Sequence, residues 1–157
     1  MLVLGIDPGD PFALAAFDGS GAVVGKCAVD AEGLGDLRRT AKLANRVYVE
    51  MPAKGGMHLN MRAACDLFES IGWIKCAAFY FAECPVVEIA TTSWRKNSHG
   101  FTRAPPEMKG KKHVGDRKAW FREKDIEFAL RFNPDIGRDH DMAAAVCIAH
   151  AGWTLSQ

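Results

Sequence analysis

Residues 2–9 read Leu-Val-Leu-Gly-Ile-Asp-Pro-Gly. The first five form a continuous apolar run, and the last three are residues that commonly form a turn. A run of this length followed at once by turn residues favours a strand that is buried on both faces. The stretch therefore predicts a central strand of a sheet, with Asp7 at its carboxyl end.

The neighbouring apolar segments predict the other strands. Residues 12–17 and 22–29 flank Asp18-Gly19-Ser20-Gly21, a pattern typical of a hairpin with a glycine-rich turn. Residues 47–49 and 85–89 are two further short apolar runs, each ended by polar or turn residues, and each predicts a strand.

Helical periodicity fills the gaps between the strands and the end of the chain. We expect helices over 34–43, over 58–82 with a break near Gly72, from an N-cap at Asp116, and from Asp139 to about Trp153, with a short turn capped by 91–93. Residues 98–115 lack apolar periodicity and predict an exposed loop. This order indicates an α/β fold with a mixed central sheet of about five strands, an antiparallel hairpin first, and helices on both faces. We expect one domain over residues 1–157.

Charge is distributed unevenly along the chain, although the net charge is only +1. Residues 94–124 contain ten Lys or Arg and three acids, a net of +7, so the remainder has ten basic and sixteen acidic residues, a net of −6. A neutral protein with one concentrated basic segment can present a phosphate-binding face. The composition is otherwise that of an ordinary globular protein.

The five cysteines are odd in number and form no Cys-x-x-Cys pair. This pattern favours buried, reduced thiols over zinc ligands or disulfides. The N-terminus lacks the features of a signal peptide, and the longest apolar-leaning stretch, 71–82, is too short to span a bilayer. We therefore expect a cytoplasmic protein, in the host cytoplasm if the source is viral, with no membrane partner.

Four acids stand where apolar runs end. Asp7 and Glu50 end two predicted strands, and Asp139 and Asp141 open the last helix. Strand ends and helix N-termini can converge at one edge of an open sheet, and gathered carboxylates need a compensating cation. Two divalent ions about 4 Å apart can activate water for phosphodiester cleavage. All-oxygen ligands suit Mg²⁺ or Mn²⁺ better than Zn²⁺.

Each acid also has an ordinary structural interpretation when it is considered alone. Asp7-Pro8-Gly9 is compatible with a plain turn, and Glu50 with a solvated strand end. Asp139 is a good N-cap. The joint placement at strand and helix ends favours the metal site.

Three motifs resemble those of RuvC-type Holliday junction resolvases. They are Gly5-Ile6-Asp7-Pro8-Gly9, Val49-Glu50-Met51-Pro52, and the alanine-rich stretch from Asp141 to His150. Gly72, residues 85–87 and residues 94–96 follow in the expected order, so the resemblance covers nearly the whole chain. It implies an RNase H-like fold, a four-carboxylate site with two Mg²⁺ ions, and a homodimer that cuts opposed strands of a four-way or otherwise branched DNA.

The chain departs from the family pattern at two places. The family usually spaces its last two acids three apart, which places Arg138, a cation, at the fourth ligand position. Asp139 is the nearest substitute and can share the site only from a non-helical cap position, and His140 is a second candidate. The resolvases often carry an aromatic wedge after the second acid, where this chain has Met57 within 53–57.

The basic segment supplies candidate DNA contacts. Lysines and arginines neutralise phosphates without reading sequence, although a charge run is often only a solvated face. Trp94 and Trp120 are expected in the core rather than as stacking platforms. The candidate nucleic-acid-binding residues are Lys54, Arg62, Lys109, Lys111, Lys112, Arg117 and Lys118.

Other functions remain open on sequence alone. The surplus apolar surface of the long helix suits a dimer partner. A YqgF-like nuclease would act on RNA, and a non-catalytic DNA-structure-binding protein would fit the cation at Arg138. An ATP-binding fragment of the actin and sugar-kinase type would need a second phosphate loop, which we do not find. No small-molecule substrate is expected.

Overall fold

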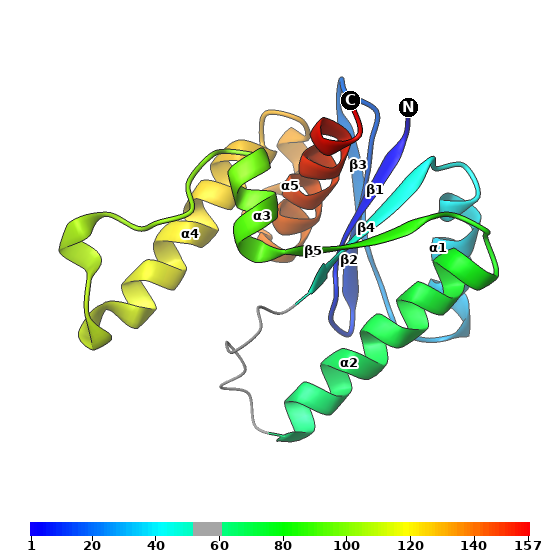
Figure 1. The fold of residues 1–157 in the computed structure, drawn as a ribbon, viewed down its shortest axis with the longest axis horizontal. Helices are drawn as coiled ribbons and strands as arrows, with labels where there is room; N and C mark the ends of the chain where they lie inside the picture. Colours follow the sequence, from blue (N-terminus) through cyan, green and yellow to red (C-terminus); the bar gives the residue numbers. More distant parts are fainter. Residues whose placement is uncertain (52–60) are drawn as a thin grey trace.

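A five-stranded mixed sheet forms the centre of the computed structural model, which describes residues 1–51 and 61–157. The strand order is β3-β2-β1-β4-β5 (Figure 1). Strands β1 (Val3–Asp7), β2 (Phe12–Phe17) and β3 (Ala22–Cys27) are antiparallel neighbours, and β4 (Arg46–Met51) and β5 (Val86–Ala90) continue the sheet parallel to β1. The predicted mixed sheet with its opening hairpin is confirmed.

Helices cover both faces of this sheet (Figure 1). On one face, α1 (Ala31–Ala41) and α2 (Met61–Lys75) pack on Leu4 and Ile6 of β1. On the other face lie α3 (Thr91–Asn97), α4 (Val114–Ala129) and α5 (His140–Leu155). Because side chains alternate along a strand, Val3, Gly5 and Asp7 point toward α5. The fold thus directs Asp7 to the start of the last helix.

Helix α5 lies unusually close to β1. A Cβ atom added at Gly5 would stand 2.2 Å from the amide nitrogen of Ala149 and 2.3 Å from the carbonyl oxygen of Ala145. Only a residue without a side chain fits this approach. Residues 143–149 of α5 are all buried, and four of the seven are alanines, so small side chains keep the two backbones in contact.

The long helix differs from its prediction. It continues through Gly72 without the expected break, and it changes into a π-helical turn, η1 (Cys76–Tyr80), after Lys75. Residues 58–60, its expected beginning, lie outside the described residues.

Two expected N-caps were wrong. Helix α4 begins at Val114 with His113 as N-cap, because two 3₁₀ turns, η2 (Pro106–Met108) and η3 (Lys111–His113), wind directly into it. Asp116 therefore lies in the first turn, where it pairs with His113. Helix α3 starts at Thr91 after Ala90, without a side-chain cap. The last 3₁₀ turn, η4 (Pro134–Ile136), precedes α5.

The structure tests the expected burial of the cysteines, and it also shows whether any described helix could span a membrane. All five cysteines are free thiols, but only Cys84 and Cys147 are buried, and Cys65 is exposed, so the expectation of general burial was wrong. Across 1–51 and 61–157, no helix combines the length and apolar character that a bilayer span requires.

Candidate active site

Asp7 and Glu50 lie side by side at the carboxyl ends of two parallel strands. The register pairs Ile6 of β1 with Val49 of β4, so the next residues of each strand are neighbours. A side-chain hydrogen bond joins the two carboxyl groups. Thr91, at the start of α3, donates its hydroxyl proton to Glu50 Oε1 and holds that side chain from the other side.

The electrostatics at Asp7 are those of a crowded acidic site. Burial, the nearby carboxylates of Glu50, Asp141 and Asp125, and the hydrogen bond with Glu50 together raise the pKa of Asp7 to about 8, with burial the largest cause. Asp7 therefore holds a proton at neutral pH. A divalent cation would lower the pKa of Asp7, because its positive charge favours the ionised carboxylate.

Asp139 is the N-cap of α5. Its backbone is extended, and its Oδ1 accepts the amide proton of Met142 at 3.1 Å. Its Oδ2 lies 2.9 Å from the ammonium nitrogen of Lys26. Partial burial raises the pKa of Asp139, but the hydrogen bonds from Lys26 and Met142 outweigh it, so that the pKa is lowered overall. The residue thus has the non-helical position that sharing the site requires, but both of its oxygens are engaged elsewhere.

Asp141 and His140 fill the first turn of α5. Asp141 Oδ2 accepts a hydrogen bond of 2.8 Å from Lys26 Nζ, and its Oδ1 lies 3.8 Å from His140 Nδ1. The opposite ring nitrogen, His140 Nε2, is 3.1 Å from Asp125 Oδ2. His140 therefore bridges Asp141 at the site and a carboxylate on α4.

Asp125 is fully buried, with 0% of its surface exposed, and its carboxylate gathers donors from three elements. Arg95 of α3 donates to it through Nε at 3.1 Å and Nη2 at 2.7 Å. His99 accepts the Phe101 amide proton at Nδ1, so its Nε2 carries the proton donated to Asp125 at 2.8 Å. Burial alone would raise its pKa, but the hydrogen bonds from His140, His99 and Arg95 hold the pKa of Asp125 well below its usual range.

Of the four predicted acids, Asp7 and Glu50 lie together, while Asp139 and Asp141 both bind Lys26. Asp7 contacts Glu50 directly, and Asp141 is close enough to raise the pKa of Asp7. In the described part of the chain, no three His, Cys, Asp or Glu side chains stand as a ready metal cage. The chemistry of these side chains suits a divalent ion. Asp7, Glu50 and Asp141 offer carboxylate oxygens, and His140 offers an imidazole nitrogen.

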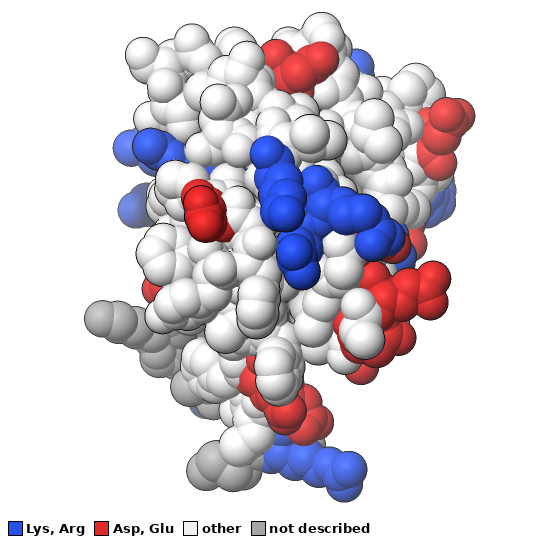
Figure 2. Space-filling view, turned by 90° about the vertical axis from the view of Figure 1, so that its right-hand side faces the viewer, with Lys and Arg blue, Asp and Glu red and all other residues white. Residues whose placement is uncertain are grey.

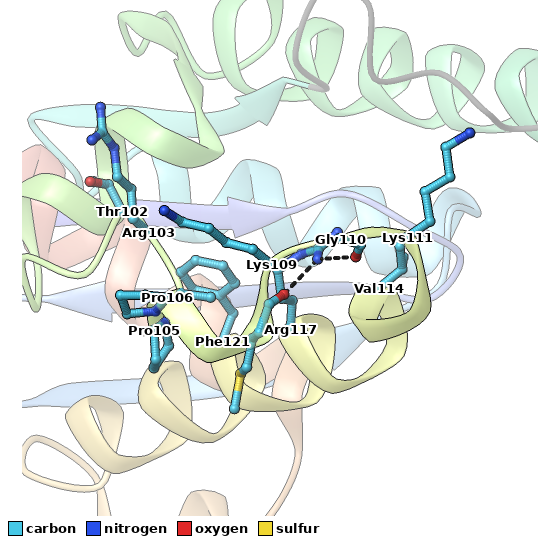
Figure 3. A pocket seen from close by; sticks show the side chains of 12 residues that line it. Thr102, Arg103, Pro105, Pro106, Lys109, Gly110, Lys111, Val114, Arg117 and Phe121 are labelled. Carbon is cyan, nitrogen blue, oxygen red and sulfur yellow. Dashed lines mark hydrogen bonds between the residues drawn. The ribbon is translucent and has the colours of Figure 1, made fainter.

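The candidate DNA-binding lysines lie on the segment between α3 and α4. Lys109, Lys111 and Lys112 are exposed, and the first two border a hollow of about 830 Å³ whose other walls include Arg103, Pro106 and Phe121 (Figure 3). This arrangement places several cations around one open surface.

Other predicted DNA contacts have different surroundings. Arg117 donates to the carbonyl oxygens of Met108 and Gly110, both at 2.7 Å, so it closes the loop on α4 (Figure 3). Lys118 is exposed on α4, and Arg62 is exposed in the first turn of α2. Lys54 and the wedge candidate Met57 lie outside the described residues.

The opposite side of the molecule has a mixed surface. Figure 2 looks onto the side away from α4 and shows a central group of Lys and Arg side chains, with acidic, uncharged and further basic side chains around it. Of the two tryptophans expected in the core, Trp94 is buried at 1% exposure, while Trp120 is half-buried and contacts Phe101 and Phe121 edge to face.

Several residues of the site were missed from sequence. Lys26 could have been found from the hairpin register, because Ala13 pairs with both Asp7 and Lys26. Asp125, His99 and Thr91 gave no usable signal, because nothing in their local sequence separates them from surface residues.

Comparison with known proteins identifies the fold. No protein-family model and no curated protein sequence matches the chain. Thermus thermophilus RuvC in complex with Holliday junction substrate matches with a TM-score of 0.63 at 20% identity, over 99% of this chain and 94% of that one. The fowlpox virus Holliday junction resolvase matches with a TM-score of 0.53 at 15% identity, over 100% of both chains. The chain has the RuvC fold.

The RuvC fold confirms the resemblance seen in the three motifs and the RNase H-like, α/β class. A further structure, that of free Thermus thermophilus RuvC, matches at 18% identity with a TM-score of 0.61 and covers 95% of that chain. In this chain, Asp139 is the N-cap of α5 and follows Arg138, and His140 and Asp141 begin the helix.

Proposed function

We propose that this chain is a divalent-metal-dependent DNA endonuclease that resolves four-way junctions and related branched DNA, acting as one nuclease domain over residues 1–157. The observation that carries the proposal is the half-buried Asp7 carboxyl at the end of β1, which lies beside Glu50 on a RuvC fold and whose pKa is raised to about 8. The placement of strongly shifted acids in one spot is typical of catalytic sites.

Asp7, Glu50 and Asp141 would hold the metal. We expect two Mg²⁺ ions per site, for which Mn²⁺ could substitute. Bound metal would supply an activated water and stabilisation of the leaving oxygen. Glu50 is oriented for this by the hydroxyl of Thr91. Asp7 gives up its proton when positive charge replaces it.

The fourth ligand is Asp139 or His140, and the contacts favour His140. Both oxygens of Asp139 serve the helix cap and Lys26. The carboxylate of Asp125 accepts the Nε2 proton of His140, which leaves Nδ1 directed at Asp141. A carboxylate behind the distal ring nitrogen is the common support of a metal-bound histidine.

The DNA would be held by charge. Two of the matched proteins were solved with Holliday junction DNA. In this chain, Lys109, Lys111 and Lys112 are exposed on a segment anchored to the site through the Asp125 contacts of His99 and Arg95. We assign phosphate contacts to these lysines, to Lys118 and to Arg62, with Lys54 as a candidate outside the described residues. Arg117 would shape the loop that carries them.

A homodimer would supply two active sites for two strands. Helix α2 and the turn after it expose large aromatic side chains, an arrangement that monomers rarely present to water. Their exposed fractions are 42% for Phe68, 51% for Trp73, 53% for Phe79, 73% for Tyr80 and 60% for Phe81. Phe68, Phe79 and Tyr80 also border a hollow of about 460 Å³ that a partner side chain could fill.

A second candidate function is junction binding without cleavage. The observation that favours it is the pairing of Asp139 and Asp141 with Lys26, together with the cation at Arg138. An RNA-directed nuclease is an alternative substrate class for the same site. We propose a cytoplasmic location for any of these.

A synthetic four-way junction tests the proposal. The wild-type protein should make paired nicks in opposed strands only when Mg²⁺ or Mn²⁺ is present. Asp7→Asn should abolish nicking and leave junction binding intact or tighter, because it removes a metal-binding carboxyl group but no basic residue. Glu32→Gln makes the matched acid-to-amide change at an exposed position of α1 and should nick normally. Binding without nicks under all conditions would establish the non-catalytic alternative, and nicking of an RNA duplex alone would establish the RNA-directed one.

A further inference from the structure

Lys26 belongs to the same row of the sheet as the acidic site. Ala13 of β2 pairs with Asp7 of β1 on one side and with Lys26 of β3 on the other. Directly paired residues in neighbouring strands point to the same face of a sheet. The backbone therefore directs Asp7, Ala13 and Lys26 toward the start of α5, and the small, fully buried Ala13 leaves room between the other two.

The ammonium group of Lys26 binds both acids of the last helix. Its nitrogen lies 2.8 Å from Asp141 Oδ2 and 2.9 Å from Asp139 Oδ2. The Lys26 side chain is 30% exposed, so it reaches these partners from the rim of the site. One monovalent cation thus neutralises part of the acidic cluster.

A divalent ion would compete with this arrangement. Asp141 offers two oxygens, and one of them is bound to Lys26 while the other faces His140 Nδ1 at 3.8 Å. An ammonium donor and a metal ion use the same lone pairs of a carboxylate. They also repel each other as like charges at close range.

We infer that Lys26 is an exchangeable counter-ion of the metal site, an inference that rests on the proposed function. It holds Asp139 and Asp141 in place in the metal-free protein. When a divalent ion binds Asp141, the Lys26–Asp141 contact breaks and the ammonium moves to the rim of the site. Lys26 thereby sets the metal concentration at which the site fills.

Metal titration without DNA tests this exchange. In calorimetric titration of the full chain with Mn²⁺, Lys26→Met should bind roughly fivefold more tightly than wild type, because a competing contact worth up to about 1 kcal/mol is gone. Lys26→Arg keeps a competing cation and should stay near the wild-type affinity. Arg138→Gln removes a charge beside Asp139 in sequence and should change affinity by less than about twofold, which separates the direct contact from general charge.

A second measurement follows the lysine itself. Amine-reactive labelling with mass spectrometry should modify Lys26 severalfold faster when Mg²⁺ is added, because the ammonium has left its carboxylates. Lys124, which pairs with Glu127 away from the site, should label at the same rate with or without metal.

The outcomes separate this inference from the nuclease proposal. Wild type that binds Mn²⁺, with Lys26→Met binding no tighter and Lys26 labelling unchanged, would overturn the exchange and leave the metal site standing. Wild type and Lys26→Met that both fail to bind Mn²⁺ would overturn the metal site and the exchange together.

Discussion

His140 at the start of α5 is hydrogen-bonded through Nε2 to the buried carboxylate of Asp125 on α4, at 3.1 Å. The same carboxylate accepts hydrogen bonds from Arg95 of α3 and from His99 of the segment that follows α3. One buried acid therefore connects the start of α5, at the candidate active site, with the helix and loop that carry the basic residues. The position of the site and the position of the basic surface depend on each other through Asp125.

Removing the Asp125 carboxylate should destabilise the fold. Asp125→Ala leaves the mostly buried guanidinium of Arg95 and the ring of His99 without their acceptor, and breaking a buried ion pair in this way costs about 3–5 kcal/mol. Urea denaturation measures the free energy of unfolding. Asp116→Ala removes an exposed carboxylate that pairs with His113, and it should cost less than about 1 kcal/mol. Equal losses for the two variants would refute the structural role of Asp125.

The stability of the metal-free protein should fall as pH rises from about 4 to about 8. Burial and the neighbouring carboxylates raise the pKa of Asp7 from 3.8 to about 8, so the folded state binds a proton that the unfolded state has lost. The contribution of this proton is complete below pH 4 and disappears as pH passes 8, with a slope of up to about 1.4 kcal/mol per pH unit.

Urea titrations in the presence of a chelator can measure this slope. Because histidines also titrate in this range, the quantity to compare is the difference between wild type and Asp7→Asn. That difference should decrease with pH, and a difference independent of pH would show that Asp7 is ionised in the folded protein. Binding of Mn²⁺ at pH 7 should also release close to one proton, which calorimetry in buffers of different ionisation enthalpy detects.

The exposed lysines before α4 should dominate the salt dependence of DNA binding. Replacing Lys109, Lys111 and Lys112 together by Gln should weaken junction binding and reduce the slope of log affinity against log salt by up to about 2.7, since each phosphate contact contributes about 0.9. Electrophoretic or fluorescence titration over a range of salt concentrations measures the slope. The matched triple variant Arg38→Gln, Arg39→Gln and Lys42→Gln, at the exposed end of α1, should keep the wild-type slope. An unchanged slope in the first variant would exclude that segment from the DNA surface.

The aromatic side chains after α2 should hold the dimer. Phe79→Asp combined with Phe81→Asp places two charges on side chains that are 53% and 60% exposed, and should weaken dimerisation at least tenfold by sedimentation velocity. Leu43→Asp alters a residue that is 76% exposed in the turn after α1, and should leave the association unchanged. A wild-type protein that sediments as a monomer at all concentrations would contradict the dimer itself.

The strands and the opening hairpin followed from local pattern, while several helix boundaries did not. Residues 2–9 predicted β1 and the position of Asp7 because an apolar run and a turn are both local signals. The start of α4 was misplaced, since the 3₁₀ turns before it depend on contacts between Arg117 and the loop carbonyls. The π-helical turn at Cys76–Tyr80 replaced an expected continuation of the α-helix, and residue spacing does not distinguish the two.

Candidate acids could be selected from the sequence, but the residues that contact them could not. Asp7, Glu50 and Asp141 could be selected because each ends an apolar run or opens a helix. Asp125 lies near the C-terminal end of α4 among charged neighbours, and its burial depends on three elements that meet only in the folded chain. Lys26 is intermediate, because strand register reveals it once the hairpin is assigned.

The absence of a side chain at Gly5 determines the distance between β1 and α5 at the candidate active site. Since α5 rests on the bare backbone of β1, the separation between the strand that ends in Asp7 and the helix that begins with Asp141 is set by atomic contact at Ala145 and Ala149. A methyl group added at Gly5 would push α5 away from β1 and increase the distance between Asp7 and Asp141, although Gly5 itself is not a candidate ligand. The spacing of the candidate ligands therefore depends on a glycine that carries no functional group.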